Sequence, residues 1–549
     1  MDNIRLFLWV AFLAMIWVTY TTWVADYAPP PAPPATSVPE ETPTPTEPAD
    51  EGLPPLAEPR SAESGPVAPA DGGAPQRAVR VVTDVLDVLI DLDGGDLVRV
   101  DLPEYPVEKH RPDVPVRLLD YEPATRWVYR TGLRTADEGA DPDHTAAFSS
   151  AVSEYRLADG QDELTVALDW KRPDGVTARK VYTFRRGEYR IDLDLELVNG
   201  SGAPLRSDGY AQMLRRHNPP KRTFRSVDSY SFTGPVLYDG EQYHKLQVDE
   251  LAEQPVTQTV TGGWMAAIQH HFLGAIVPPP ALEMRYQATA RDDQFVLSTV
   301  APAQEVAPGG RLELPLRLFV GPKLQDQLAA TANELELTVD YGVLTVLAQP
   351  LFWMLSHIER VVGNWGWAIV IATFIIKLVF YKLTATSGRS MAKMRKLAPR
   401  MKALQERYKD DRQALGQAMM ELYKREKVNP AAGCLPILVQ MPFFFAYYWV
   451  LVESVEMRQA PFILWIDDLS SRDPYFVLPL LMGAAMFLQT RLNPAPPDPV
   501  QARVTQIMPI AFTVFFAFFP SGLVLYWLTN TVLSILQQWR INTIVARES

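Results

Sequence analysis

Long apolar stretches and short alternating ones divide the chain into two kinds of sequence. The long stretches occupy residues 4–24, 361–383, 434–452, 475–492, 507–519 and 522–539. Because a helix needs roughly 20 residues to cross a bilayer core, this pattern predicts six transmembrane helices. The last two are separated by FPSG (519–522), in which proline and glycine favour a turn.

Residues 79–321 have the period of two that β-strands show. In YRIDLDLELVNGS (189–201), the residues from Ile191 to Leu197 alternate between apolar and acidic side chains. In DVLIDLDGGDLVRVDL (87–102), two such runs flank a Gly-Gly pair. Strands at short intervals with turn residues between them predict a large antiparallel β-sandwich, with the acidic positions on the solvent faces of strands.

Between the β region and the apolar stretches, residues 322–360 are expected to form connecting and interfacial helices. QPLFWMLSHIERVVGN (349–364) has apolar residues at helical spacing, namely Leu351, Leu355, Ile358 and Val362. Its charged residues lie elsewhere on the helix. Such spacing predicts an amphipathic helix on the membrane surface.

The N-terminal 78 residues are predicted to hold an anchor (1–27) and a linker (28–78). The linker has 15 prolines and 8 Asp/Glu among 51 residues, a composition that cannot bury enough apolar surface to fold and stays extended. A cleavable signal peptide is the alternative to an anchor. Because Asp26 stands two residues before Ala28, no small-x-small cleavage site follows, and we favour an uncleaved transmembrane anchor.

The distribution of charge predicts the topology. The net charge is −12, but residues 382–430 carry 13 Lys/Arg and 5 Asp/Glu, and basic loops of this kind stay in the cytoplasm. Residues 454–474 are more acidic than basic and are expected on the other side. Both termini then lie in the cytoplasm, and the β-sandwich is exported; in a bacterium with an outer membrane, that places it in the periplasm. The single cysteine, Cys434, excludes an intrachain disulfide.

Polar residues within the apolar stretches cluster towards the predicted cytoplasmic side. Lys377 lies one helical turn after Thr373. Further polar residues are Gln440, Gln489, Gln506, Asn530, Ser534 and Gln537. This asymmetry predicts a water-containing hollow open to the cytoplasm. Alternatively, Lys377 extends its ammonium group to the lipid headgroups, and the glutamines form ordinary interhelical hydrogen bonds. From these residues alone, the two interpretations have equal weight.

The basic region predicts a cytoplasmic helical hairpin at 384–430. Its first helix has apolar residues at helical spacing, namely Met391, Met394, Leu397, Ala398, Met401 and Leu404, and Asp410-Asp411 can cap a second helix. A methionine-rich surface adapts to varied apolar partners, although such a stripe is more often the contact between the two helices. The basic charge suits ribosomal RNA or anionic lipid, and the positive-inside bias alone accounts for much of it.

Sequence patterns for catalysis and cofactor binding are absent. The chain has no GxxxxGK loop, no GxGxxG after a strand, no HExxH, no GxSxG and no cysteine cluster. His270-His271 lacks the spacing of a metal site, and adjacent residues of a strand point to opposite faces. We therefore expect a protein that is not an enzyme, with no catalytic residue, no metal and no cofactor.

Three stretches of the C-terminal region are specific enough to indicate a family. They are NWGWAIVIATFI (364–375), the stretch from SMAKMRKLAPRM to PLLMG (390–483), and PSGLVLYWLTN (520–530). They closely resemble the membrane protein insertases of the YidC/Oxa/Alb family. The anchor, the linker and the β-sandwich resemble its Gram-negative branch, so the resemblance covers nearly the whole chain.

The resemblance implies a five-helix core (361–541) with a hydrophilic groove open to the cytoplasm and to lipid. Lys377 takes the position of the groove charge, where relatives commonly carry Arg; lysine keeps the charge but loses bidentate pairing with a carboxylate. The implied polar groove residues are Thr373, Gln440, Asn530 and Ser534. The implied substrate contacts are Met441, Pro442, Phe444, Phe515, Tyr526 and Trp527. The hairpin is implied to recruit substrate through Met391, Met394, Arg395 and Met401.

The implied function is the insertion and folding of nascent inner-membrane proteins, alone or with the Sec translocon. The implied partners are nascent membrane proteins, Sec translocon components, the ribosome and the phospholipid bilayer. The cytoplasmic tail, 542–549, is short and not strongly basic, which does not favour a ribosome contact through the tail. The alternatives are a small-solute transporter or channel that uses Lys377, and a membrane-anchored periplasmic carbohydrate-binding protein.

Overall fold

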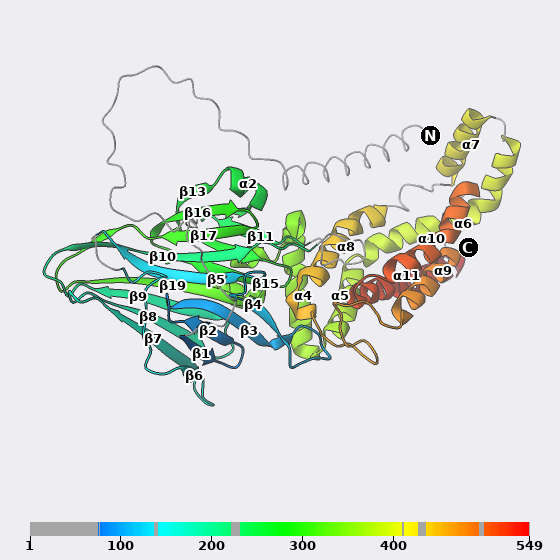
Figure 1. The fold of residues 1–549 in the computed structure, drawn as a ribbon. Coiled ribbons are helices and arrows are strands. Elements are labelled where there is room, and N and C mark those ends of the chain that lie inside the picture. The colour runs from blue at the N-terminus through cyan, green and yellow to red at the C-terminus, as the bar shows by residue number, and fades with distance from the viewer. Residues whose placement is uncertain are drawn as a thin grey trace, which may run out of the picture. The chain divides into compact units, whose positions relative to one another are not determined.

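The structure is a computed structural model that describes residue 75 and residues 77–136, 141–220, 231–408, 411–426, 435–492 and 499–547. The predicted anchor (1–27) and nearly all of the predicted linker (28–78) lie outside the described residues. The described chain forms two compact units, a β-rich unit that ends at Val339 and a helical unit that begins at Asp340 (Figure 1). The two units are described in turn.

The β-rich unit contains two sheets. The larger has eleven strands, which are β1 (Ala78–Val82), β2 (Asp87–Asp91), β3 (Asp96–Pro106), β4 (Pro115–Leu119), β5 (Trp127–Thr135), β6 (Glu154–Arg156), β10 (Leu205–Arg216), β13 (Val256–Thr261), β16 (Glu283–Arg291), β17 (Gln294–Val300) and β18 (Gln304–Val306). The strand order is β13-β16-β17-β10-β5-β3-β2-β1-β6, with β4 paired to β3 and β18 paired to β10. The pair β1–β6 is parallel, whereas the other pairs are antiparallel.

The second sheet has eight strands and is antiparallel throughout. They are β7 (Glu163–Lys171), β8 (Thr177–Arg185), β9 (Arg190–Val198), β11 (Gly234–Tyr238), β12 (Tyr243–Lys245), β14 (Trp264–Ile268), β15 (Phe272–Val277) and β19 (Arg311–Pro322). Their order is β12-β11-β14-β15-β19-β9-β8-β7. Two short helices, α2 (Val248–Glu253) and α3 (Gln325–Thr331), complete the unit. The prediction that this region is mostly β is confirmed.

The alternating sequences form strands as expected. In β9, the apolar residues from Ile191 to Leu197 are fully buried, and the acidic residues between them are only partly buried. The Gly-Gly pair lies between β2 and β3, where Gly94 has a φ of 105°. Glycine suits this position because a Cβ on Gly94 would lie 2.5 Å from the carbonyl oxygen of His144.

A buried lysine and a buried tyrosine connect the two sheets. Lys180 of β8 donates hydrogen bonds to the Thr131 carbonyl (2.6 Å) and Oγ1 (3.0 Å) on β5, and to the Gly94 carbonyl (2.5 Å). The Tyr129 hydroxyl of β5 donates to the Phe319 carbonyl of β19 at 3.0 Å. Asp96 lies 3.9 Å from the Lys180 ammonium. Burial lowers the pKa of Lys180 to about 8 and raises the pKa of Asp96 to about 7, with the attraction between the two opposing both shifts.

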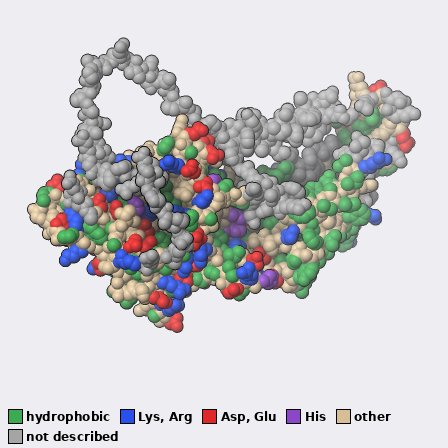
Figure 2. All heavy atoms as spheres, in the orientation of Figure 1, with side chains coloured by type: hydrophobic (Ala, Val, Ile, Leu, Met, Phe, Trp, Pro, Cys, Tyr) green, Lys and Arg blue, Asp and Glu red, His purple; other side chains and the backbone are tan. Residues whose placement is uncertain are grey.

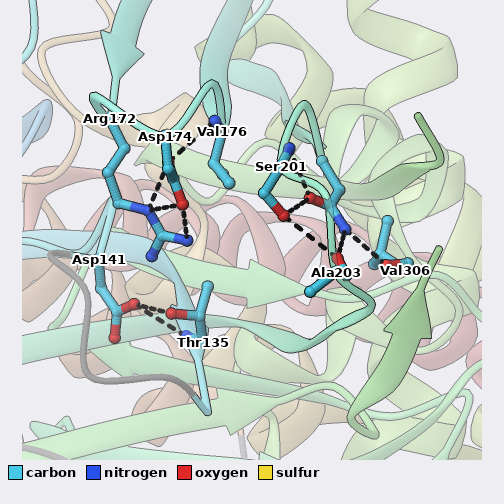
Figure 3. Close-up of polar contacts among 9 residues, drawn as sticks. Thr135, Asp141, Arg172, Asp174, Val176, Ser201, Ala203 and Val306 are labelled. Atoms are coloured by element: carbon cyan, nitrogen blue, oxygen red, sulfur yellow. Dashed lines mark hydrogen bonds and ion pairs between the residues drawn. The ribbon is translucent and has the colours of Figure 1, made fainter. Parts of the chain in front are cut away.

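Short polar contacts fix three turns of the β-rich unit (Figure 3). The Arg172 guanidinium pairs with Asp174, which also accepts the Val176 amide at 3.2 Å and so closes the turn from β7 to β8. The Asn199 amide donates to the carbonyls of Ala203 (2.9 Å) and Val306 (2.8 Å). Figure 3 also shows Asp141 accepting from the amide and hydroxyl of Thr135. The Arg172–Asp174 and Thr135–Asp141 contacts join residues that are close in sequence, whereas the Asn199–Val306 hydrogen bond joins the loop after β9 to the end of β18.

The helical unit contains eight α-helices among the described residues. They are α4 (Thr345–Val362), α5 (Trp365–Val379), α6 (Tyr381–Arg407), α7 (Arg412–Arg425), α8 (Leu435–Glu453), α9 (Val477–Leu492), α10 (Pro499–Phe516) and α11 (Ser521–Arg547). The C-terminal helix, α11, packs against α5, α6 and α9, while α4 packs against α5 and α8. The FPSG turn is confirmed, because α10 ends before it and α11 begins within it.

The predicted number of transmembrane helices is not confirmed by the described helices. Within the described part of the chain, none is both long enough and apolar enough to cross a bilayer alone. The predicted span at 361–383 is wrong as one helix: α5 ends at Val379, and α6 continues after a bend of 65°. This bent pair passes the length and hydropathy test together, and α9 and the 503–516 part of α10 are shorter apolar helices.

Two local predictions can be compared with the helices directly. The predicted amphipathic helix is α4, in which Leu351 and Leu355 are buried but Val362, assigned to the same face, is 40% exposed. Asp411 caps α7, and its carboxylate accepts the amides of Gln413 and Ala414. The capping prediction is therefore confirmed, and the position of α4 on the membrane surface stays a prediction.

Candidate polar and aromatic site in the helical unit

Lys377 and Ser534 form the central contact of the candidate site. Lys377 lies near the end of α5, and its ammonium donates a hydrogen bond of 2.8 Å to the Ser534 hydroxyl on α11. The Ser534 hydroxyl in turn donates to the Asn530 carbonyl, one turn earlier on α11, at 2.7 Å. Both side chains are partly buried. The lysine is therefore held between two helices, α5 and α11.

The other predicted groove residues lie on three helices. The Thr373 side chain is 1% exposed, and its hydroxyl donates to the Ile369 carbonyl within α5 at 2.6 Å. The Gln440 Nε2 atom of α8 is buried and has no hydrogen-bond partner among the residues that the structure describes. Asn530 is partly buried on α11, with its carbonyl bonded to Ser534. Of the four predicted polar residues, the structure joins Asn530 and Ser534 to Lys377 in one chain of hydrogen bonds.

An aromatic cluster connects α8, α10 and α11 in the same unit. The Phe444 ring stacks on Tyr526 with centroids 5.8 Å apart and meets Trp527 edge to face at 4.7 Å. Phe516 lies 4.9 Å from Trp527 and 5.4 Å from Phe515. Four predicted substrate contacts thus meet in one cluster, with Phe515 itself 54% exposed at its edge.

The two other predicted contacts, Met441 and Pro442, lie beside this cluster on α8. Met441 is partly buried and Pro442 is exposed. Five aromatic residues that contact the cluster were missed from the sequence. They are Phe445 and Phe519, together with Tyr447, Phe512 and Phe516. Their spacing was the available signal, because Tyr447 is three residues after Phe444, and Phe512 and Phe516 are one helical turn apart.

The outer surface of the helical unit is strongly apolar. Figure 2 shows green side chains gathered over the part of the unit that holds α9 and α11. Among the described residues of α5, α9, α10 and α11, the most exposed apolar side chains are Leu378, Val379, Leu480, Leu488, Ile507, Ile510, Val514, Phe515, Leu536 and Trp539. A patch of this extent is typical of a surface that faces lipid or a protein partner. The polar contacts of Lys377 therefore lie inside an apolar exterior.

The predicted recruitment residues all lie on α6. Met394 and Met401 are partly buried, whereas the side chains of Met391 and Arg395 lie outside the described part of the chain. Leu397 is buried, and so is Leu422 on α7. Arg400 near the middle of α6 pairs with Glu426, just after α7, at 2.7 Å. The two helices form a hairpin, and the roles of its methionines stay a prediction.

The reason given for dismissing the histidine pair is wrong. His270 and His271 lie in the turn between β14 and β15, not within a strand, and their rings stack with centroids 3.7 Å apart. In the described part of the chain, no group of three or more His, Cys, Asp or Glu residues could hold a metal ion. The pair carries no metal site of its own.

Comparison with protein families divides the chain within α4, between residues 354 and 357, whereas the structure divides it between Val339 and Asp340. Residues 78–354 match the family described as the YidC periplasmic domain, and residues 357–548 match the family described as 60Kd inner membrane protein. The first match covers the β-rich unit, and the second covers α5 to α11. The chain is thus an inner membrane protein with a periplasmic domain. It belongs to the YidC family.

Several relatives match over almost their whole length. The chain is 50% identical to the membrane protein insertase YidC of Thioalkalivibrio sulfidiphilus over 98% of each chain. It is 46% identical to the membrane protein insertase YidC of Nitrosococcus oceani over 100% of both chains. It is 47% identical to the membrane protein insertase YidC of Methylococcus capsulatus over 98% of both chains. A crystal structure titled as an active YidC insertase aligns at 19% identity over 84% of this chain and 92% of that one, with a TM-score of 0.39, too low to carry an argument.

Proposed function

We propose that this protein inserts nascent proteins into the inner membrane and assists their folding. Relatives that are 46–50% identical over the whole chain are named membrane protein insertases. The structural observation that supports this role is the Lys377–Ser534 contact inside a helical unit whose outside is apolar. The small-solute transporter gains no support from these relatives, because none of the three carries such a name.

The proposed arrangement in the membrane keeps the boundaries expected from the sequence. The anchor (1–27) leads through the linker (28–78) to the periplasmic β-sandwich (79–321), and the interfacial helices (322–360) lead to the insertase core (361–541). The hairpin (384–430), the tail (542–549) and the N-terminus lie in the cytoplasm. The exposed apolar side chains of α9 to α11 support this arrangement, because lipid is the solvent that covers such a surface at least cost.

The Lys377 site lowers the cost of moving a polar substrate segment into the membrane. The ammonium attracts an acidic segment, and the hydroxyl and amide groups of Ser534, Thr373, Asn530 and Gln440 offer transient hydrogen bonds. Polar groups inside a bilayer are costly because lipid provides no partners, and these side chains provide them. No nucleotide is needed, since each strongly apolar substrate residue that enters lipid contributes roughly 0.3–0.6 kcal/mol.

The aromatic cluster gives the substrate an apolar route towards lipid. Phe444, Tyr526 and Trp527 present ring faces and edges that pack against varied apolar side chains, and Phe515 extends the cluster to the surface. Met441 and Pro442 on α8 complete the proposed contact surface. The hairpin residues Met391, Met394, Arg395 and Met401 recruit the substrate, and Sec translocon components and the ribosome are the proposed partners.

Charge reversal at Lys377 tests the proposed function. The full chain is reconstituted into lipid vesicles, and insertion of a single-span substrate with an acidic N-terminal segment is measured by protease protection. Lys377→Glu is expected to abolish most insertion, and Lys377→Arg is expected to keep it. Lys382→Glu is the matched control, because Lys382 is an exposed lysine five residues further along the chain. Equal insertion by Lys377→Glu and the wild type would contradict the role of Lys377.

A further inference from the structure

The segment between α8 and α9, residues 454–476, contacts the N-terminal ends of three helices. These helices are α5, α9 and α11, which are far apart in sequence. We refer to residues 454–476 as the clamp. It carries little regular structure, with a single turn of 3₁₀-helix at Val455–Met457, so side-chain and backbone contacts determine its conformation.

The clamp holds α5 through Asn364, the N-cap residue of that helix. The Asn364 side chain accepts the Trp367 amide, and its Nδ2 atom donates to the carbonyls of Pro461 (3.3 Å) and Phe462 (3.2 Å). Next to it, a Cβ on Gly366 would lie 2.1 Å from the Phe462 ring. The helix and the clamp are therefore packed with no room for even a methyl group.

The clamp holds α9 through Asp473, whose side chain is 1% exposed. One carboxylate oxygen accepts the Trp465 indole N–H and the Tyr475 amide, both at 3.0 Å. The other oxygen accepts the Leu478 amide, in the first turn of α9, at 2.7 Å. Three donors satisfy this buried carboxylate and fix the start of α9 to the clamp.

The clamp holds α11 through its own backbone carbonyls. The Ser521 amide donates to the Ser471 carbonyl at 2.7 Å, and the Gly522 amide donates to the Leu469 carbonyl at 2.9 Å. The Ser521 hydroxyl adds hydrogen bonds of 2.8 Å to the carbonyls of Asp468 and Ser471. Backbone atoms thus cap the N–H groups with which α11 begins.

Internal contacts keep the clamp in one conformation. Met457, Ile466 and Leu469 are buried, and the Leu469 amide donates to the carbonyl of Ala460 at 2.9 Å. Three residues without the freedom of glycine have left-handed backbones, namely Gln459, Leu464 and Phe476. Such conformations persist only where the surroundings hold them, so the clamp is a rigid element.

At the other end of the unit, long side chains join α11 to α5 and to the start of α6. The contacts are the Lys377–Ser534 hydrogen bond of 2.8 Å, between α5 and α11, and a longer one of 3.4 Å from Gln537 of α11 to the Tyr381 carbonyl of α6. The two helices run in the same direction, because a Cβ on Gly522 would touch Ile369 while Ser534 touches Lys377 further along. Side-chain contacts can open without moving the backbone that the clamp fixes.

We infer that the clamp is a fixed hinge, so that α11 separates from α5 and from α6 only at the Lys377 end when a substrate enters. This inference rests on the proposed insertase function, since it states how that site opens. The capped N-terminal ends keep their spacing, and the ends beyond Lys377 and Ser534 move apart. The polar site is then exposed to substrate from one side of the unit alone.

Two reversible disulfides test the hinge in the full chain with Cys434→Ser. The clamp disulfide is Leu469→Cys with Gly522→Cys, because a Cβ at 522 lies 3.4 Å from the Leu469 Cβ, close to the roughly 3.5–4.5 Å that disulfides prefer. The far disulfide joins α6 to α11 beyond Lys377 and Ser534. It is Gly388→Cys with Ile541→Cys, where a Cβ at 388 lies 3.6 Å from the Ile541 Cγ2 atom. Each variant is assayed for insertion in vesicles, oxidised and reduced.

The oxidised clamp variant is expected to insert substrate as well as its reduced form. The oxidised far variant is expected to lose about tenfold in insertion rate and to recover it on reduction, which separates a blocked motion from a damaged structure. A clamp disulfide that blocks insertion, or a far disulfide without effect, overturns the hinge. If the reduced variants and the wild type all fail to insert substrate, the proposed function itself is wrong.

Discussion

The Ser534 hydroxyl accepts a hydrogen bond of 2.8 Å from the Lys377 ammonium and donates one of 2.7 Å to the Asn530 carbonyl. The serine thus uses both of its hydrogen-bonding roles, one across helices and one along α11. This arrangement points the ammonium towards α11 while leaving it further donors for a substrate. The contact therefore orients the charge rather than neutralising it.

Removal of the Ser534 hydroxyl is expected to weaken substrate insertion moderately. Ser534→Ala removes the hydroxyl that bonds both Lys377 and the Asn530 carbonyl. Loss of the contact with Lys377, worth about 1 kcal/mol, corresponds to about a fivefold lower insertion rate. The matched control is Thr543→Ala, because the Thr543 hydroxyl bonds only a carbonyl of its own helix in the described contacts, one turn back at Trp539. An equal loss in both variants would show a general effect on α11 and contradict the role of Ser534.

Lys180→Met is expected to destabilise the β-rich unit by about 3 kcal/mol, because it leaves buried acceptors and Asp96 without their cation. Amide hydrogen exchange of the full chain in detergent measures this loss of stability as faster exchange in peptides from β5 and β8. The double variant Lys180→Met/Asp96→Asn is expected to recover part of it, since the second change removes the unpaired carboxylate. Additive effects of the two substitutions would contradict a direct interaction.

His144 is expected to make the β-rich unit less stable in mild acid. Its Nδ1 atom lies 2.6 Å from the Tyr210 hydroxyl, and burial, followed by the charge of Arg130, lowers the pKa of His144 from 6.5 to about 4. Between these values the unfolded chain binds more protons than the folded one. The free energy of unfolding therefore falls as the pH falls from about 6.5 to 4.

The matched pair His144→Asn and His110→Asn isolates this contribution, because His110 is exposed. His144→Asn is expected to reduce the difference in free energy of opening between pH 7 and pH 5, and His110→Asn to leave it unchanged. Asp96 acts in the opposite direction, since its raised pKa makes the folded state the better proton binder below pH 7. Because Asp96 is present in the wild type and in both variants, its contribution to the pH dependence cancels when the three proteins are compared. Equal pH dependence in all three proteins would rule out His144 as the cause.

Asp411→Ala is expected to destabilise α7 by about 1 kcal/mol, because two amides at its start lose their acceptor. Faster amide exchange confined to α7 and the facing part of α6 would be the measured effect. Glu421→Ala, at an exposed position within the same helix, is the control and is expected to change exchange little. A loss of protection throughout the helical unit would show that the hairpin is not an independent element.

The sequence predicted the elements whose patterns are local. The alternation in β9 and the Gly-Gly turn between β2 and β3 depend on neighbouring residues, and both form as expected. The break of the 361–383 stretch at Phe380 could not be predicted, because the apolar pattern continues through it without a proline or glycine. Lys180 occupies an inward position of an alternating strand, yet its partners come from a turn and a strand of the other sheet.

The candidate site was predictable only in its composition. Lys377, Asn530 and Ser534 stand out as polar residues in apolar stretches, but the sequence does not show which of them touch. Tyr447 and Phe516 did not stand out, because aromatic residues are common throughout these helices. Asp473 counted only as a negative charge in a loop, whereas it is a buried carboxylate that three donors satisfy.

Site-specific photocrosslinking to a stalled nascent membrane protein tests the central claim most directly. A photoreactive residue replaces Phe444 in the aromatic cluster, and a second protein carries it at Tyr475, a 68% exposed position in the clamp. The proposed function predicts crosslinks from position 444 to the apolar segment of the substrate, their loss with Lys377→Glu, and few crosslinks from position 475. Equal crosslinking from both positions, or none from 444 while the substrate is still inserted, would contradict the account.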